Sequence, residues 1–175
     1  MFSDPESNLR GLGVAPGMTV ADFGSGAGFY VLAASKMVAP DGRVYAVEIQ
    51  KDLLERLKNL LSREGVGNVS VVWGDVENPG GCHLKNSSVD AVIVSNILFQ
   101  VENKEGLVKE ALRILKPNGR ILLVDWKDAG AVGGPPLSDI VSKNEAIDLF
   151  SASGLEAIDE VDAGAGHYGL IFARK

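Results

Sequence analysis

The fold of this chain is decided by the stretch Thr19-Val20-Ala21-Asp22-Phe23-Gly24-Ser25-Gly26-Ala27-Gly28. Its apolar residues suit a short strand of a parallel sheet that is covered on both faces. The glycines at 24, 26 and 28 leave no side chain between the backbone and a ligand above the turn. A helix that begins at about Gly28 would direct its free N–H groups to the same place. The stretch therefore predicts a closely held ligand.

Composition narrows the class of protein. The 175 residues are 46% hydrophobic and 23% charged, which is typical of a soluble globular domain. The start lacks the pattern of a signal peptide, no apolar run approaches the roughly 18 residues of a membrane span, and the single Cys82 excludes an internal disulfide. A cytoplasmic protein without a membrane span is expected. The net charge of −6 weighs against broad nucleic-acid binding, although it leaves a structured RNA open.

Strand and helix patterns alternate outward from the glycine turn. Asp4 caps a short N-terminal helix that Gly11 and Gly13 should stop, so residues 1–15 form a helical segment. Ser142 and Glu145 form a capping box ahead of the last helix. The pattern predicts one α/β domain over residues 1–175 with a doubly wound, mostly parallel sheet. Strands are expected over 19–23, 43–49, 69–75, 90–96 and 120–125, helices over 29–38, 53–64, 104–115 and 143–152, and a closing antiparallel hairpin over 155–161 and 168–173.

Three features restrict the ligand. The third glycine falls at 28, and Phe29 stands where the dinucleotide pattern G-x-G-x-x-G requires glycine. Glu48 ends the second strand, where a carboxylate can accept hydrogen bonds from both ribose hydroxyls and would repel a 2′-phosphate. Asp75 ends the third strand and could accept a hydrogen bond from an adenine amino group. The alternative for each carboxylate is a helix cap or a solvated loop residue.

Together these segments resemble the class I S-adenosylmethionine-dependent methyltransferases over residues 9–175. Asp22 to Gly28 is similar to their first motif, residues 44–48 to the segment that supplies the ribose carboxylate, and 74–76 to the adenine-side motif. Residues 90–96 and 115–120 resemble the fourth strand and the turn before the fifth. Within that family, these motifs are most similar to those of the ubiquinone/menaquinone-biosynthesis group, which is methyltransferase type 11-like. The resemblance implies seven strands in the order 3-2-1-4-5-7-6 with a C-terminal antiparallel hairpin.

The resemblance also implies a cofactor and roles for individual residues. The cofactor is S-adenosyl-L-methionine (SAM), which becomes S-adenosyl-L-homocysteine (SAH). Asp22 would orient its ammonium group, Glu48 would hold the ribose, and Asp75 would read the adenine edge. The full set of implied cofactor residues is Asp22, Gly24, Ser25, Gly26, Gly28, Glu48, Ile49, Asp75, Val76 and Ser95.

Methyl transfer is an in-line displacement that needs alignment more than particular side chains, so no catalytic residue is predicted. The acceptor is expected to be a small molecule. Residues at the same sheet edge are candidates to contact it, with helix packing as the alternative for the aromatic pair Phe29 and Tyr30. These candidates are Tyr30, Asn96, Gln100 and Trp126, with Phe29 and Asp125 beside them.

Other chemistries have weaker support in the sequence. The Asn-Pro-Pro-Tyr type of motif found in amino-methylating enzymes is missing after the fourth strand, and a lone Cys82 disfavours arsenic methylation. His83 and His167 are far apart in the sequence, and neither is assigned a catalytic role. No metal site is predicted.

Two ways of covering the site are expected. Residues 126–141 are rich in Gly and Pro and leave the correct sheet edge, which makes them a candidate lid. The N-terminal segment is short for the family, which predicts either an open site for a large substrate or a homodimer whose second subunit covers it. Two alternatives to a methyltransferase stay open, namely a non-catalytic nucleoside-binding module and an NAD-dependent oxidoreductase.

Overall fold

A computed structural model describes residues 4–127 and 134–175. It contains a seven-stranded sheet in the order β3-β2-β1-β4-β5-β7-β6, with β7 antiparallel to both β5 and β6 and the remaining pairs parallel. The predicted α/β class, strand order and closing hairpin are confirmed. The strands are β1 (Thr19–Phe23), β2 (Arg43–Glu48), β3 (Val69–Trp73), β4 (Val89–Ser95), β5 (Leu115–Trp126), β6 (Leu155–Val161) and β7 (His167–Arg174).

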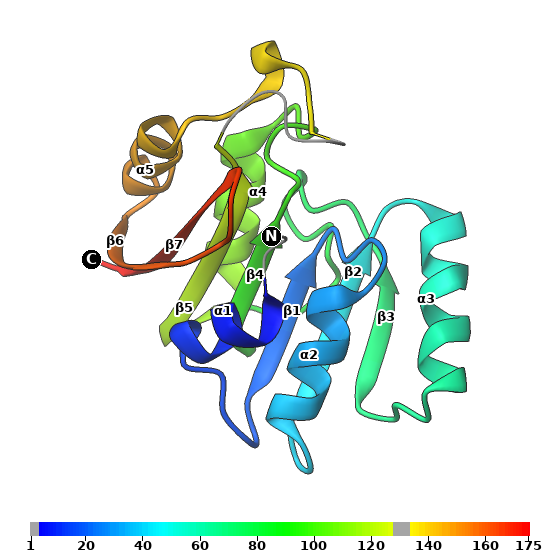
Figure 1. The fold of residues 1–175 in the computed structure, drawn as a ribbon. Helices are drawn as coiled ribbons and strands as arrows, with labels where there is room; N and C mark the ends of the chain where they lie inside the picture. The colour runs from blue at the N-terminus through cyan, green and yellow to red at the C-terminus, as the bar shows by residue number, and fades with distance from the viewer. Residues whose placement is uncertain (1–3, 128–133) are drawn as a thin grey trace.

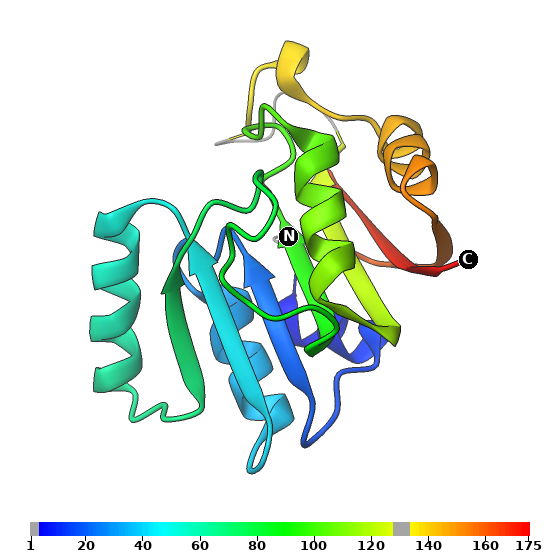
Figure 2. The same ribbon diagram turned by 180° about the vertical axis from the view of Figure 1, so that it is seen from behind.

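Helices cover both faces of the sheet (Figures 1 and 2). Apolar residues of α1, α2 and α3 form one core cluster with the strands, and those of α4 and α5 join a second cluster on the other face. Phe150 of α5 stacks on Phe172 of β7 with ring centroids 4.2 Å apart. The helices are α1 (Pro5–Leu12), α2 (Phe29–Val38), α3 (Lys51–Arg63), α4 (Lys104–Ile114) and α5 (Lys143–Ala152), with a 3₁₀ turn η1 (Leu137–Asp139).

The central strand β1 lies between β2 and β4, with Val20 beside Val44 on one side and Ala91 on the other. Its residues from Val20 to Phe23 are buried, as expected for a strand covered on both faces. The parallel strands all end at one edge, so the turns that follow β1, β2 and β4 come together there.

Several boundaries differ from those expected. Gly11 lies inside α1, where a Cβ would come within 2.6 Å of Val161; it serves close packing on β6 and does not stop the helix. β3 ends at Trp73, which leaves Asp75 in the following loop. β5 begins at Leu115, so the expected turn at 117–119 belongs to an irregular start of that strand. Trp126 is its last residue. Residues 128–133 of the candidate lid lie outside the described residues.

The connection from β3 to β4 carries no helix. Residues 74–88 cross the face of the sheet as a loop beside α4 (Figure 2). Parallel strands are usually joined through a helix, whose backbone groups satisfy one another. This loop needs hydrogen-bond partners from elsewhere. No helix in the two described ranges is long and apolar enough to span a membrane.

Candidate functional site

A cavity of about 870 Å³ opens at the carboxyl ends of the parallel strands, where ligands bind in sheets of this kind. Its walls come from the segments after β1, β2, β3 and β4, with single residues from the starts of α1 and β7. The residues that line it are Pro5, Asp22, Gly24, Ser25, Gly26, Ala27, Phe29, Tyr30, Val47, Glu48, Ile49, Gln50, Leu53, Gly74, Asp75, Val76, Glu77, Ser95, Asn96, Ile97, Gln100, Val101 and His167.

Most of the residues predicted from the sequence meet in this cavity. Every predicted cofactor residue except Gly28 lines it, as do Tyr30, Asn96 and Gln100 from the acceptor candidates. Gly28 caps α2 with a φ of 84°, and a Cβ there would come within 2.5 Å of Leu57. Both the positive φ of the turn and the close packing on α3 therefore require glycine at this position. Trp126 and Asp125 are not among the lining residues.

The glycine turn is built mainly from its own backbone. Gly24, Gly26 and Gly28 all have positive φ values, which favour glycine. The N–H groups of Gly24 and Ser25 both donate to the carbonyl of Val47, at 2.9 and 3.1 Å. These N–H groups are therefore satisfied within the protein. What the turn offers a ligand is close approach of the backbone, together with the Ser25 hydroxyl, which is buried and has no partner.

Glu48 links the glycine turn to the start of α3. Its carboxylate accepts hydrogen bonds from the N–H groups of Gly26 at 3.0 Å and of Ile49 and Gln50 at 2.9 Å. The residue is buried, and no ion pair to it is found among the described residues. Its negative charge is therefore left to act on the cavity. The neighbouring Ile49 is 52% exposed and lines the cavity, with its carbonyl accepting from Trp73 Nε1 at 3.0 Å.

Asp22 is the most deeply buried acid of the cavity wall. It lies in β1 and its carboxylate has no hydrogen bond within residues 4–127 and 134–175. Burial, with a smaller effect from the charge of Glu48, raises the pKa of Asp22 to about 8. A buried acid without partners is costly for the fold unless a ligand uses it. This makes Asp22 a strong candidate for contact with a cation.

The third wall is the loop after β3. Asp75 Oδ1 accepts from the N–H of Glu77 at 3.0 Å, and its Oδ2 from Asn78 Nδ2 at 2.6 Å. The carboxylate thus stabilises the start of its own loop, and it is not a helix cap, because no helix follows β3. It also lines the cavity with Val76, so these hydrogen bonds and ligand contact are compatible.

The fourth wall follows β4 and is held from behind by Asp125. The carboxylate of Asp125 accepts from the N–H groups of Leu98 at 2.9 Å and Trp126 at 2.8 Å. Burial raises the pKa of Asp125 to about 6, against these hydrogen bonds, which lower it. Asn96 has a φ of 56° and a buried Oδ1 without a partner. Asp125 therefore shapes the loop that presents Asn96.

His167 lines the cavity, although the sequence predicts no functional role for it. It begins β7, which runs antiparallel, so its first residue lies at the edge where β5 ends, opposite Trp126. The two rings are 4.2 Å apart and tilted by 37°. Both ring nitrogens of His167 and Nε1 of Trp126 are buried without a hydrogen-bond partner. Burial lowers the pKa of His167, partly opposed by the backbone of Ala165. Buried polar atoms that the protein leaves without partners are available to hydrogen-bond a ligand.

Comparison with known proteins agrees with this geometry. A family model described as a methyltransferase domain matches residues 15–152. A ubiquinone/menaquinone biosynthesis C-methyltransferase from Hahella chejuensis is 31% identical over 144 residues, which are 82% of this chain and 53% of that protein. An arsenite methyltransferase from Halobacterium salinarum is 27% identical over 86% of this chain and 36% of its own length. The chain thus spans about half or less of the curated relatives it matches.

The solved structures match this chain over most of both lengths. The crystal structure of a SAM-dependent methyltransferase from Aquifex aeolicus has a TM-score of 0.89 and 28% identity, and the match covers 98% of this chain and 89% of that one. A type 11 methyltransferase structure from Sulfolobus solfataricus has a TM-score of 0.81 and 23% identity, which supports the fold. The family match, the strand order with its antiparallel end and the glycine turn beside Glu48 agree, and the chain belongs to the class I SAM-dependent methyltransferases.

Proposed function

We propose that this chain binds SAM in the cavity and transfers its methyl group to a small acceptor without negative charge. The observation that carries the proposal is the charge of the cavity wall. Asp22, Glu48, Asp75 and Glu77 line it, and no lysine or arginine is found among its lining residues in the described ranges. Family membership supplies the reaction class, and the wall supports the choice of ligands.

The donor set fits the cofactor. SAM carries a positive sulfonium and a positive ammonium group, and carboxylates in a partly desolvated cavity stabilise positive charge. We assign Asp22 to the ammonium group, Glu48 to the ribose and Asp75 to the adenine edge. The pyrophosphate of NAD would place negative charge against the same carboxylates, which counts against an NAD-dependent oxidoreductase, as does Phe29 at the start of α2.

When bound, the cofactor supplies an electrophilic methyl group on sulfur. The protein then has to orient an acceptor atom in line with that group and exclude competing water. We assign the orientation to Tyr30, Asn96 and Gln100, which line the cavity. The Tyr30 hydroxyl accepts a hydrogen bond from Asn8 at 2.7 Å, which fixes the ring. Trp126 contributes through its contact with His167 and is assigned to the second layer of the wall.

Two kinds of acceptor are disfavoured, one by the charge of the cavity wall and one by the state of Cys82. A carboxylate or phosphate would meet acidic side chains and no lysine or arginine among the described lining residues. Arsenite requires thiolates, which are the soft ligands that bind such centres. Cys82 is buried and burial raises the pKa of its thiol to about 11, so it does not supply a thiolate.

Two covers for the cavity stay part of the proposal, residues 126–141 and a second copy of the chain. Phe29 lines the cavity and is 73% exposed, so it is an apolar side chain that a cover would bury. Sedimentation at working concentration separates the two covers. A monomer that still turns over small acceptors would exclude the second copy.

Calorimetry with SAM, SAH and NAD tests the cofactor. We expect binding of the first two and none of NAD, and preferred binding of NAD would overturn the proposal. A methyl-transfer screen then compares neutral acceptors bearing a hydroxyl or amine with their carboxylate and phosphate counterparts. Activity confined to the anionic partners would contradict the assignment of acceptor charge, and tight SAH binding without transfer to any acceptor class would favour the nucleoside-binding module.

A further inference from the structure

The loop of residues 74–88 combines two properties. Its first part, from Gly74 to Glu77, forms one wall of the cavity. It also replaces the helix that would ordinarily connect β3 to β4, so its backbone N–H groups lack a regular set of partners. Whatever satisfies these groups also determines where the cavity wall stands.

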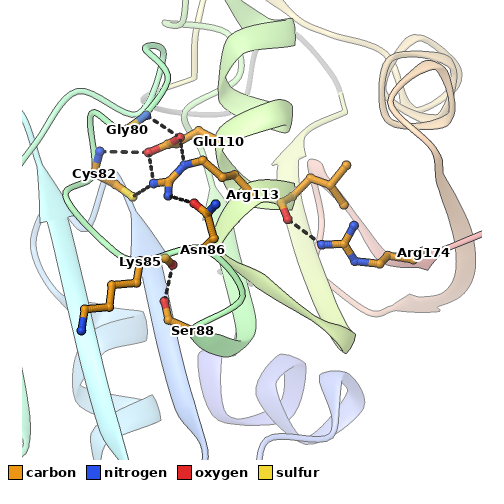
Figure 3. Close-up of polar contacts among 9 residues, drawn as sticks. Gly80, Cys82, Lys85, Asn86, Ser88, Glu110, Arg113 and Arg174 are labelled. Atoms are coloured by element: carbon orange, nitrogen blue, oxygen red, sulfur yellow. Dashed lines mark hydrogen bonds and ion pairs between the residues drawn. The ribbon is translucent and has the colours of Figure 1, made fainter.

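Glu110 of α4 accepts hydrogen bonds from two of these N–H groups. It is 1% exposed, and its Oε2 accepts from the N–H of Gly80 at 2.9 Å while its Oε1 accepts from the N–H of Cys82 at 3.1 Å (Figure 3). The loop and α4 are about 30 residues apart in the sequence at this contact. A glutamate in the interior of a helix is thereby used to fasten a loop.

Arg113, one turn further along α4, fixes the glutamate in place. Its Nε and Nη2 donate to the two carboxylate oxygens, both at 2.8 Å, in a bidentate pair. Its Nη1 donates to Asn86 Oδ1 at 2.6 Å, and Nη2 also lies 3.5 Å from Cys82 Sγ (Figure 3). Burial alone would raise the pKa of Glu110, but the hydrogen bonds from Arg113, Cys82 and the loop backbone outweigh it and lower the pKa to about 2. The carboxylate therefore stays ionised and paired.

Contacts inside the loop carry this anchoring to the cavity. The N–H of Asp75 donates to the carbonyl of Gly81 at 3.1 Å. The packing is so close that a Cβ on Gly81 would lie 2.0 Å from the carbonyl oxygen of Asp75, and one on Gly74 would lie 2.6 Å from the carbonyl oxygen of Gly81. Any shift of residues 80–82 away from α4 therefore moves residues 74 and 75.

We propose that Glu110, held by Arg113, is a positioning residue for the cofactor, because it fixes the 74–88 loop so that Asp75 and Val76 stand at the adenine end of the cavity. The inference rests on the proposed function for the identity of the ligand. Glu110 itself does not line the cavity, so it acts only through the loop.

The first test measures affinities of the purified, folded full chain for SAH and for adenosine, well below the unfolding transition. We expect Glu110→Gln to weaken both by a similar factor, about tenfold, because both ligands carry adenine. Arg174→Gln is the matched control. Arg174 of β7 donates through Nη2 to the carbonyls of Leu112 and Leu115 at the C-terminal end of α4, each at 2.8 Å, and forms no hydrogen bond with Glu110 or Arg113 (Figure 3 labels Arg174). We expect its loss to leave both affinities unchanged.

The second test needs no variant, because Cys82 is the only cysteine and reports on the same loop. It is fully buried, so its reaction with a thiol reagent measures opening of residues 80–82. We expect saturating SAH to slow this reaction at urea concentrations too low to unfold the chain. In Glu110→Gln, the reaction should be faster than in the wild type.

The outcomes separate the two proposals. A wild-type chain that binds neither SAH nor adenosine overturns the proposed function. A wild type that binds SAH, with Glu110→Gln binding it equally well, overturns the positioning role. So does a labelling rate of Cys82 that SAH leaves unchanged, and this result is available even if the variant fails to fold.

Discussion

Two buried glutamates, Glu48 and Glu110, hold the two loops that bound the cavity, and they do so with different charge environments. Glu48 accepts hydrogen bonds from Gly26, Ile49 and Gln50, and no cation pairs with it among the described residues. Glu110 accepts from Gly80 and Cys82 in the same manner, but Arg113 neutralises it through two hydrogen bonds.

The difference indicates which glutamate serves a ligand. A buried carboxylate without a cation keeps its field and attracts a positively charged or hydroxyl-bearing ligand, and Glu48 lines the cavity. A carboxylate that is fully paired has no remaining demand on a ligand, and Glu110 lies behind the wall. The unpaired charge of Glu48 also acts on Asp22, whose pKa is raised by burial and further by that charge.

The largest loss of stability expected from a single substitution comes from removing the cation of the structural pair. Arg113→Met leaves Glu110 buried and ionised, and we expect the free energy of unfolding to fall by about 3 kcal/mol, at the lower end of the range for buried pairs because Arg113 is partly exposed. Urea denaturation measures it. Adding Glu110→Gln should recover part of the loss. Lys109→Met removes an exposed pair from the same helix and should cost no more than about 0.5 kcal/mol; equal losses for Arg113→Met and this control would contradict the distinction.

The next effect concerns the unpaired glutamate and is on binding. Glu48→Gln should weaken SAH binding by about 1.5–3 kcal/mol, the scale of hydrogen bonds to a charged group. Stability should fall less, because the amide oxygen still accepts from Ile49 and Gln50. Calorimetry gives the affinity, with the exposed Glu64→Gln as control. An unchanged affinity would mean that Glu48 does not hold the ribose.

The third prediction follows from the raised pKa of Asp22. Between pH 4 and 8 the native state keeps a proton that the unfolded state has lost, so stability should fall with rising pH by up to about 1.4 kcal/mol per unit and level off above pH 8. A bound ammonium group favours the carboxylate, so SAH binding should release a proton and tighten over the same range. Asp22→Asn should remove the pH dependence of both the stability and the SAH affinity. Calorimetry in buffers of different ionisation enthalpy measures the proton release. No release on SAH binding would mean that Asp22 faces no cation.

The smallest expected effect concerns the far wall. His167→Phe keeps a ring against Trp126 but removes both unpartnered nitrogens. If a nitrogen meets the acceptor, kcat/KM for that acceptor should fall by up to about tenfold, the value of one hydrogen bond, while SAH affinity stays the same. His83→Asn is the control, since His83 is exposed and its φ of 58° suits asparagine. An equal effect on SAH affinity would assign His167 to the cofactor side.

The sequence by itself determined the sheet and most of the cavity. The glycine turn, the alternation of strand and helix patterns and the capping box at Ser142 are local signals, and the structure has each of them where they were expected. Since parallel strands end at one edge, the positions of Asp22, Glu48 and Ser95 followed from the strand boundaries.

Only the tertiary structure decided which distant groups meet. His167 reaches the cavity because β7 runs antiparallel, and nothing in the residues around it indicates a ligand. In the sequence, Glu110 looks like an ordinary charged residue of a helix. Its role appears only in the fold, where a loop replaces the helix between β3 and β4 and lies against it. Gly28 looks in the sequence like a glycine that contacts a ligand. In the structure, a Cβ there would come within 2.5 Å of Leu57, so close packing requires glycine. Periodicity and turn chemistry act over a few residues, whereas these contacts join residues about 30 or more apart, or depend on how two helices pack, and are fixed only when the whole chain is folded.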